Sequence, residues 1–120
     1  MTTKTETIHA GEHLVSEGNK SISRESIVIA SGEGVLLPGT VLGKVTAGGE
    51  YRAYAAANVD GSEVAAGVLF DGVDATSAAQ DAVAHVRDCE VAKADLTWDT
   101  PADEAAGTAD LLVNHVILRD

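Results

Sequence analysis

The chain has a single cysteine, Cys89, among its 120 residues. One cysteine cannot form an intramolecular disulfide, which fits a reducing compartment. A catalytic thiol would need a base. His85 lies four residues upstream in a strand-like stretch, too far for a direct hydrogen bond. We therefore interpret Cys89 as buried and inert.

Aromatic side chains are also scarce. Although 45% of the chain is hydrophobic, only 3% is aromatic, so the apolar residues are mostly alanine and valine. Small side chains bury little area each, and an isolated monomer of this composition gains only modest stability from its core. This composition favours self-association. The aromatic residues are Tyr51, Tyr54, Phe70 and Trp98.

Basic residues are few: Lys and Arg number 8 against 19 Asp and Glu, which gives a net charge of −11. Binding to nucleic acid or to anionic membranes depends on clustered cations, so neither is expected as a partner. The N-terminus has no apolar core of signal-peptide length, and no segment approaches the roughly 20 apolar residues that span a bilayer. We therefore expect a protein made in the cytoplasm.

The patterns that are present predict a mostly β fold, a small barrel-like or sandwich-like domain. Short β-branched or apolar runs bounded by Gly, Asp and Ser are typical of strands and turns. A tight hairpin is predicted through "TAGGE" at 46–50, and a bulge near 87–88. The predicted strands cover residues 25–30, 39–46, 51–54, 64–70, 82–92 and 115–118.

One short C-terminal helix is predicted after Thr100, which is a good N-cap residue and is followed by Pro101. Asn114 is expected to end the helix in the left-handed conformation. Gly107 weakens the helix by about 1 kcal/mol relative to alanine. Helical spacing predicts a buried face of Ala102, Ala105, Ala106, Ala109, Leu112 and Val113.

Residues 1–23 are polar and show neither helical nor strand periodicity, so we expect an extended N-terminal arm before a β-rich domain at 24–120. The arm could be a flexible tail or a docking strand. His9 and His13 have the spacing of metal ligands only on a helix, and Gly11 lies between them, so we expect solvated side chains. His85 and His115 fall in predicted strands and are interpreted as packed or hydrogen-bonded.

No catalytic, cofactor or metal motif is found. Gly39, Gly43 and Lys44 faintly suggest a phosphate loop, but the glycines are one residue too close and Val45 replaces the required Ser or Thr. These glycines are better explained by turns and close packing. The acidic residues at 71–81 lack the calcium-loop pattern, and no serine lies in G-x-S-x-G. We expect a protein that is not an enzyme and has no cofactor.

The order of these signals resembles a known family. "SRESIVIASGEGVLLPGTVLGKVTAGGEY", "NVDGSEVAAGVLFDGVDATSA", "EVAKADLTW" and "HVILRD" follow one another as in the lambda-type head decoration proteins of bacteriophages. The most specific pieces are "PGTVLG", "DGS…AAGVL", "VDAT" and L-x-W. The motif residues that we interpret as structural are Gly39, Gly43, Asp60, Gly61 and Trp98.

This resemblance implies a homotrimer on the outer surface of the expanded phage head, at its local threefold positions. It implies binding to the major capsid protein and stabilisation of the shell around packaged DNA, with no enzymatic activity. The protein would be made in the bacterial host cytoplasm and reside in the virion. In this family the N-terminal arm reaches the capsid. The candidate capsid-binding residues are therefore Thr5, Ile8, Leu14 and Val15.

One alternative from another class stays open. A stand-alone binding module on a phage or bacterial surface could recognise a receptor or carbohydrate by stacking on exposed aromatic rings. Tyr51, Tyr54 or Trp98 would form that platform.

Overall fold

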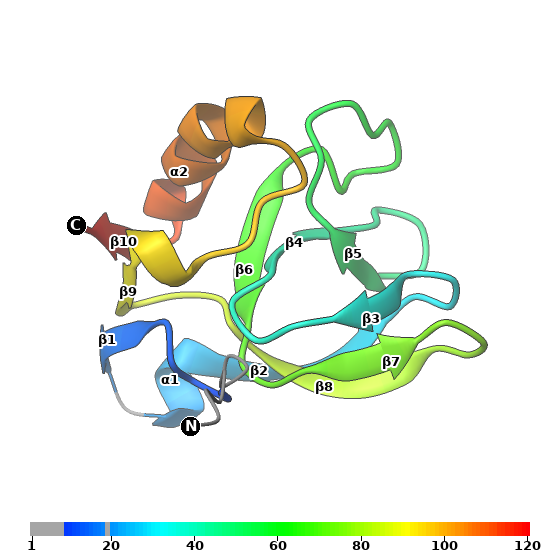
Figure 1. The fold of residues 1–120 in the computed structure, drawn as a ribbon, viewed down its shortest axis with the longest axis horizontal. Helices are drawn as coiled ribbons and strands as arrows, with labels where there is room; N and C mark the ends of the chain where they lie inside the picture. The colour runs from blue at the N-terminus through cyan, green and yellow to red at the C-terminus, as the bar shows by residue number, and fades with distance from the viewer. Residues whose placement is uncertain (1–8, 19) are drawn as a thin grey trace, which may run out of the picture.

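The computed structural model describes residues 9–18 and 20–120. It confirms a mostly β domain with one helix of substantial length near the C-terminal end of the described chain (Figure 1). The strands are β1 Leu14–Glu17, β2 Arg24–Ile29, β3 Gly34–Leu36, β4 Val41–Lys44, β5 Tyr51–Ala53, β6 Ala65–Leu69, β7 Val73–Ala75, β8 Gln80–His85, β9 Cys89–Ala92 and β10 Val116–Arg119. The helices are α1 Lys20–Ser23 and α2 Glu104–Val113, with 3-10 turns at Lys93–Asp95 and Pro101–Asp103.

A closed barrel forms the centre of the molecule, with strand order β2-β5-β4-β6-β8. Its longest pairing is antiparallel, between β2 and β8. The predicted hairpin is confirmed, because β4 and β5 pair with Lys44 opposite Tyr51. Alternation along β2 turns Ile27 and Ile29 inward and leaves Val28 more exposed. The barrel interior is therefore filled by aliphatic side chains and Tyr51.

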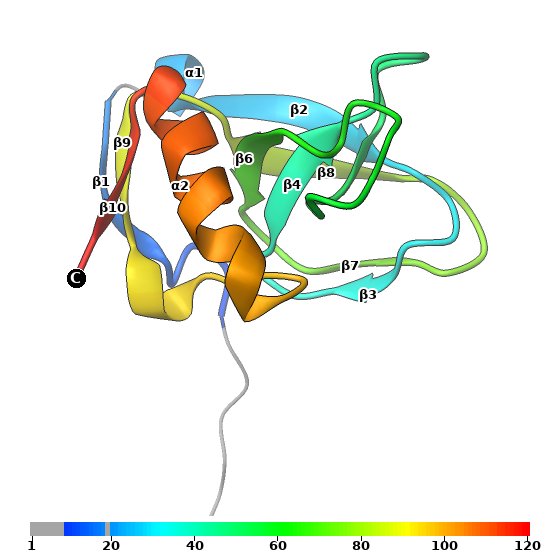
Figure 2. The same ribbon diagram turned by 90° about the horizontal axis from the view of Figure 1, so that it is seen from above.

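A second layer covers one end of the barrel. The three-stranded sheet β1-β9-β10 and helix α2 lie together at that end, and the β3–β7 pair lies at the opposite end (Figures 1 and 2). A second apolar cluster fills the space between the barrel and α2. Its fully buried members include Val68 from β6, Leu111 from α2 and Val116 from β10.

Two features of the sheet topology differ from the sequence prediction. The single bulged strand predicted at 82–92 is two strands, β8 and β9, because Asp88 adopts a left-handed conformation with φ 51° and turns the chain. The short strands β3 and β7 were not predicted at all. They pair with each other across Gly34 and Ala75, and segments so short and so rich in Gly and Asp carry little periodic signal.

Helix α2 is packed by a different face from the one predicted. Only Gly107 and Leu111 are buried, whereas Leu112 and Val113 are 56% and 78% exposed. The predicted alanine face is wrong because the helix approaches its neighbours through the smallest residue it has. The left-handed residue after the helix is His115 (φ 60°), and Asn114 has φ −99°.

The prediction of an unpacked arm up to residue 23 is wrong for the part of the arm that the structure describes. Residues Leu14–Glu17 form β1, which pairs antiparallel with β9. Ser23 is buried, and its hydroxyl donates a hydrogen bond to Asp88 O (3.0 Å) and accepts one from Gly18 N (3.0 Å). Specific polar contacts hold this segment, so hydrophobic periodicity could not reveal it. Thr5 and Ile8 lie outside the described residues.

Candidate functional site

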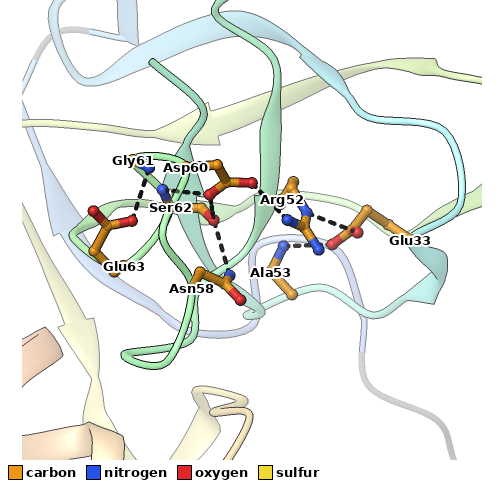
Figure 3. Close-up of polar contacts among 8 residues, drawn as sticks. All are labelled: Glu33, Arg52, Ala53, Asn58, Asp60, Gly61, Ser62 and Glu63. Atoms are coloured by element: carbon orange, nitrogen blue, oxygen red, sulfur yellow. Dashed lines mark hydrogen bonds and ion pairs between the residues drawn. The ribbon is translucent and has the colours of Figure 1, made fainter. Parts of the chain in front are cut away.

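The "DGS" turn of the sequence motif is held by a polar network between β5 and β6 (Figure 3). Arg52 Nη1 donates a hydrogen bond to Asp60 Oδ2 at 2.6 Å, and its Nε donates to Glu33 Oε2 at 3.2 Å. Glu33 Oε1 also accepts a hydrogen bond from the Ala53 amide at 2.8 Å. One guanidinium therefore joins the β2–β3 connection to the β5–β6 loop.

Asp60 orders the turn from within. Its Oδ1 accepts hydrogen bonds from the Ser62 hydroxyl (2.5 Å) and the Ser62 amide (3.1 Å). Asn58 Nδ2 donates to the same hydroxyl at 2.8 Å. These contacts with Ser62, together with Arg52, lower the pKa of Asp60 to about 2. The carboxylate thus stays ionised and structural, and it is not placed to transfer protons near neutral pH.

Two motif glycines allow this turn to pack closely on β4. Gly61 has φ 108°, and a side chain there would also collide with Thr46 and lie 2.7 Å from Lys44 O. A Cβ on Gly43 would collide with the Ser62 backbone. The phosphate-loop interpretation was rejected from the sequence. The structure places Gly43 and Lys44 of that motif in strand β4, where Gly43 allows the Ser62 backbone to pack closely.

Gly39 and Trp98 connect the barrel to the helical side. Gly39 (φ 88°) donates its amide to Leu69 O and accepts a hydrogen bond from the Thr97 amide, each at 2.9 Å. The half-buried Trp98 ring lies edge-on to Tyr54, with 6.1 Å between centroids, and against Gly107 of α2. All five motif residues therefore lie at contacts between chain segments.

The aromatic rings do not form an exposed stacking platform. Tyr51 is 7% exposed and Tyr54 is 1% exposed. Trp98 is half-buried against α2. Stacking on Tyr51 or Tyr54, as the alternative binding module would require, is therefore excluded, and at Trp98 only the part of the ring not covered by α2 is exposed.

Among the four candidate capsid-binding residues, the structure describes Leu14 and Val15. Leu14 is half-buried and packs against the apolar cluster beneath α2, so it serves the core. Val15 points outward and is 55% exposed. Sequence reasoning missed other apolar side chains on the surface: Val35, Leu37, Val59, Val64, Leu112 and Val113. Val35 and Leu37 line a shallow groove of about 280 Å³ that also contains Trp98.

The expectation of solvated histidines in the arm is wrong for His13. Its side chain is fully buried, and its Nε2 lies 3.1 Å from His85 Nδ1. His85 is also fully buried, which agrees with its interpretation as packed and hydrogen-bonded. The signal was absent from the sequence because the two residues are 72 positions apart.

Cys89 is buried, as predicted. Burial, and then the nearby charges of Glu17 and Asp88, raise the pKa of its thiol to about 11, so the thiol stays protonated. Among residues 9–18 and 20–120, no group of three or more His, Cys, Asp or Glu side chains is arranged to hold a metal ion. The described helices include none long and apolar enough to cross a membrane.

Comparison with known proteins gives one family. The family model described as bacteriophage lambda head decoration protein D matches residues 3–116. No curated protein matches the chain. Because the family match covers nearly the whole sequence, this chain belongs to the bacteriophage lambda head decoration protein D family, a family of structural components of the phage head.

Proposed function

We propose that this protein binds the major capsid protein on the outside of the expanded phage head as a homotrimer and stabilises the shell around its packaged DNA. The family match over residues 3–116 is the observation that carries this proposal. The small side chains of the core and the exposed apolar residues on α2 support a protein that buries further surface on assembly.

Multivalency supplies the mechanism. A single arm would bury little area and bind weakly. Three arms on one trimer turn the later contacts into intramolecular ones, which raises avidity by about 10² to 10⁴. A net charge of −11 suits an outer coat that does not bind the DNA inside the head. Assembly would follow synthesis in the bacterial host.

Because β1 is paired with β9, the residues proposed to contact the capsid are a smaller set than the whole arm 1–23. Removing residues 9–18 would delete a strand, a buried histidine and the ion pair of Glu17 with Arg24 (2.8 Å). We therefore assign the docking role to residues 1–8 together with the outward face of β1, where Val15 is exposed. An exposed apolar residue on this strand can extend the contact of an arm that adds to a capsid sheet.

Co-sedimentation with expanded, undecorated heads tests the proposal. We expect deletion of residues 2–8 to abolish co-sedimentation. The number of subunits measured by light scattering and the melting temperature should stay unchanged. Val15→Ser should weaken binding, and Val59→Ser, at a 95% exposed loop position, is the matched control. Full binding by the truncated protein would show that the folded body carries recognition. A monomer both free and on heads would refute the trimer.

A further inference from the structure

We propose that β1 is a detachable strand: the neutral His13–His85 pair fastens the segment 9–18 to the barrel, and uptake of one proton by the pair releases it. This goes beyond the decoration role and does not depend on it. The contacts that carry the proposal form one chain of polar side chains running from β1 into β8 and β2.

The chain of contacts is continuous and mostly buried. His13 Nε2 lies 3.1 Å from His85 Nδ1. The other nitrogen of His85, Nε2, lies 3.2 Å from Glu17 Oε2. Both oxygens of Glu17 accept hydrogen bonds from Arg24, at 2.8 and 3.2 Å. The side chain of Glu17 is only 13% exposed, so water contributes little to this arrangement.

The positions of the protons follow from the acceptors. The hydrogen bonds from Arg24 keep the pKa of Glu17 below its ordinary value, so Glu17 is a carboxylate and can only accept. The charge of Glu17 beside Nε2 favours the His85 tautomer with its proton on Nε2, although the 3.2 Å contact lacks hydrogen-bond geometry. This tautomer leaves His85 Nδ1 as an acceptor for the Nε2 proton of His13. Each ring is neutral in this arrangement. Within the described part of the chain, His13 Nδ1 and His85 Nε2 are both buried and neither makes a hydrogen bond.

A further proton has no acceptable place in this arrangement. On His85 Nδ1 it would face the N–H of His13 unless His13 moved its own proton to Nδ1. In that case, as when the proton is added directly to His13 Nδ1, His13 Nδ1–H becomes a buried donor without an acceptor. Burial, and then the neighbouring His85, lower the pKa of His13 to about 4. Burial also lowers the pKa of His85, although Glu17 acts in the opposite direction.

The neighbouring elements offer no free compensating charge. Glu17 on β1 is already paired with Arg24 on β2, and Arg24 itself adds positive charge. At the start of β9, Cys89 stays neutral and Asp88 is 47% exposed on the surface beside His115. Strand β6, which pairs with β8 at His85, contains only alanine, glycine, valine and leucine.

The other contacts of segment 9–18 are made mainly at its ends and by one apolar side chain: Gly18 N donates to Asp88 O and Ser23 Oγ, each at 3.0 Å, and Leu14 packs against the cluster beneath α2. The pairing of β1 with β9 is short, and its register shifts between Leu14 and Ser16. The His13 carbonyl accepts the Ala92 amide at 2.6 Å, and the Gly11 amide donates to Phe70 O at 2.9 Å. The barrel is held independently by the long pairing of β2 with β8. Loss of the histidine contact should therefore release β1 locally and leave the barrel closed.

Amide hydrogen exchange followed by NMR at pH 7 and pH 3.5 tests the proposal, with rates corrected for the intrinsic effect of pH. We expect the amides of Gly11, Leu14, Gly18 and Ala92 to lose at least about tenfold in protection at pH 3.5, since one proton on a group with a pKa near 4 is bound by most molecules there. Barrel amides such as that of Leu69 should stay protected.

Two variants separate the histidine pair from general acid effects. His13→Gln keeps an N–H donor toward His85 and cannot take up a proton, so its β1 amides should stay protected at pH 3.5. His115→Gln is the matched control, because that side chain is 76% exposed and should leave the release unchanged. His85 remains in this variant, so its ring titration is followed in the same samples. Release in His13→Gln at the same pH as in the parent, with the His85 ring still neutral, would overturn the proposal and point to Glu17 instead.

The unmodified protein provides a second measurement that needs no variant. The ring carbons of His13 and His85 report their own titration by NMR. Release of the β1 amides over the same pH range as the titration of either ring supports the proposal. Release at a different pH, full protection with a protonated ring, or simultaneous loss of protection in the barrel would each overturn it.

Discussion

Replacing Gly107 by alanine should destabilise this protein, although alanine is the better helix former. Gly107 is buried in the middle of α2. A Cβ there would collide with the Trp98 ring and lie 3.0 Å from Tyr54 Cε2. Tyr54 is 1% exposed and meets Trp98 edge-on, so neither ring can move aside without disturbing the other.

The net effect is the difference between two opposing contributions. Alanine gains about 1 kcal/mol of helix propensity over glycine. An extra methyl group in a packed site costs about 1–3 kcal/mol, and a collision with a rigid ring belongs at the upper end. We therefore expect Gly107→Ala to lower the free energy of unfolding by about 1–2 kcal/mol. The melting temperature should fall by about 4–8 °C.

Urea unfolding followed by far-UV circular dichroism measures this difference. Ala109→Gly, at an exposed position of the same helix, is the control for helix propensity, and its free energy of unfolding should be about 1 kcal/mol lower than that of the parent. In a Trp98→Leu background the collision with the ring is removed and only the close approach to Tyr54 remains, so Gly107→Ala should then raise the free energy of unfolding by up to about 1 kcal/mol. A Gly107→Ala protein that is more stable than its parent would refute the close packing of α2 on Trp98.

Three further results are expected. Trp98→Ala should lower the free energy of unfolding by about 2–3 kcal/mol, less than the roughly 3–5 kcal/mol expected for a fully buried ring. An unchanged melting temperature together with lost binding to heads would instead make Trp98 a capsid-contact residue. Because His13 has a pKa near 4 folded and 6.5 unfolded, the unfolded chain binds more protons between these values, and stability should fall by about 3 kcal/mol from pH 7.5 to pH 4; an equal fall in His13→Gln would contradict this. Gly61→Ala should lower the free energy of unfolding by about 2 kcal/mol or more. Gly32→Ala, where φ is also positive (90°) but the space is open, should lower it by about 1 kcal/mol. Equal losses at the two positions would show that the close approach at Gly61 adds no cost.

Local patterns in the sequence determined much of the secondary structure. The β-branched run at 25–30, the apolar run at 64–70 and the glycine-rich turn at 46–50 predicted β2, β6 and the β4–β5 hairpin, because their signals lie within a few residues. Pro101 begins a 3-10 turn, Pro101–Asp103, rather than α2 itself, which begins at Glu104; the Thr100 side chain makes no capping hydrogen bond, so that part of the prediction is wrong. The order of short motifs along the whole chain was sufficient to identify the family.

Only the tertiary structure decided how the N-terminal segment and α2 are packed. The contact of His13 with His85 joins residues 72 apart, so no local period or spacing could encode it. Likewise, α2 turns its smallest residue, Gly107, toward the barrel because the Trp98 ring fills the space where a side chain would lie. Hydrophobic periodicity ranks residues by how much area they can bury. Whether a position instead needs a small or polar residue depends on the partner that the fold brings to it.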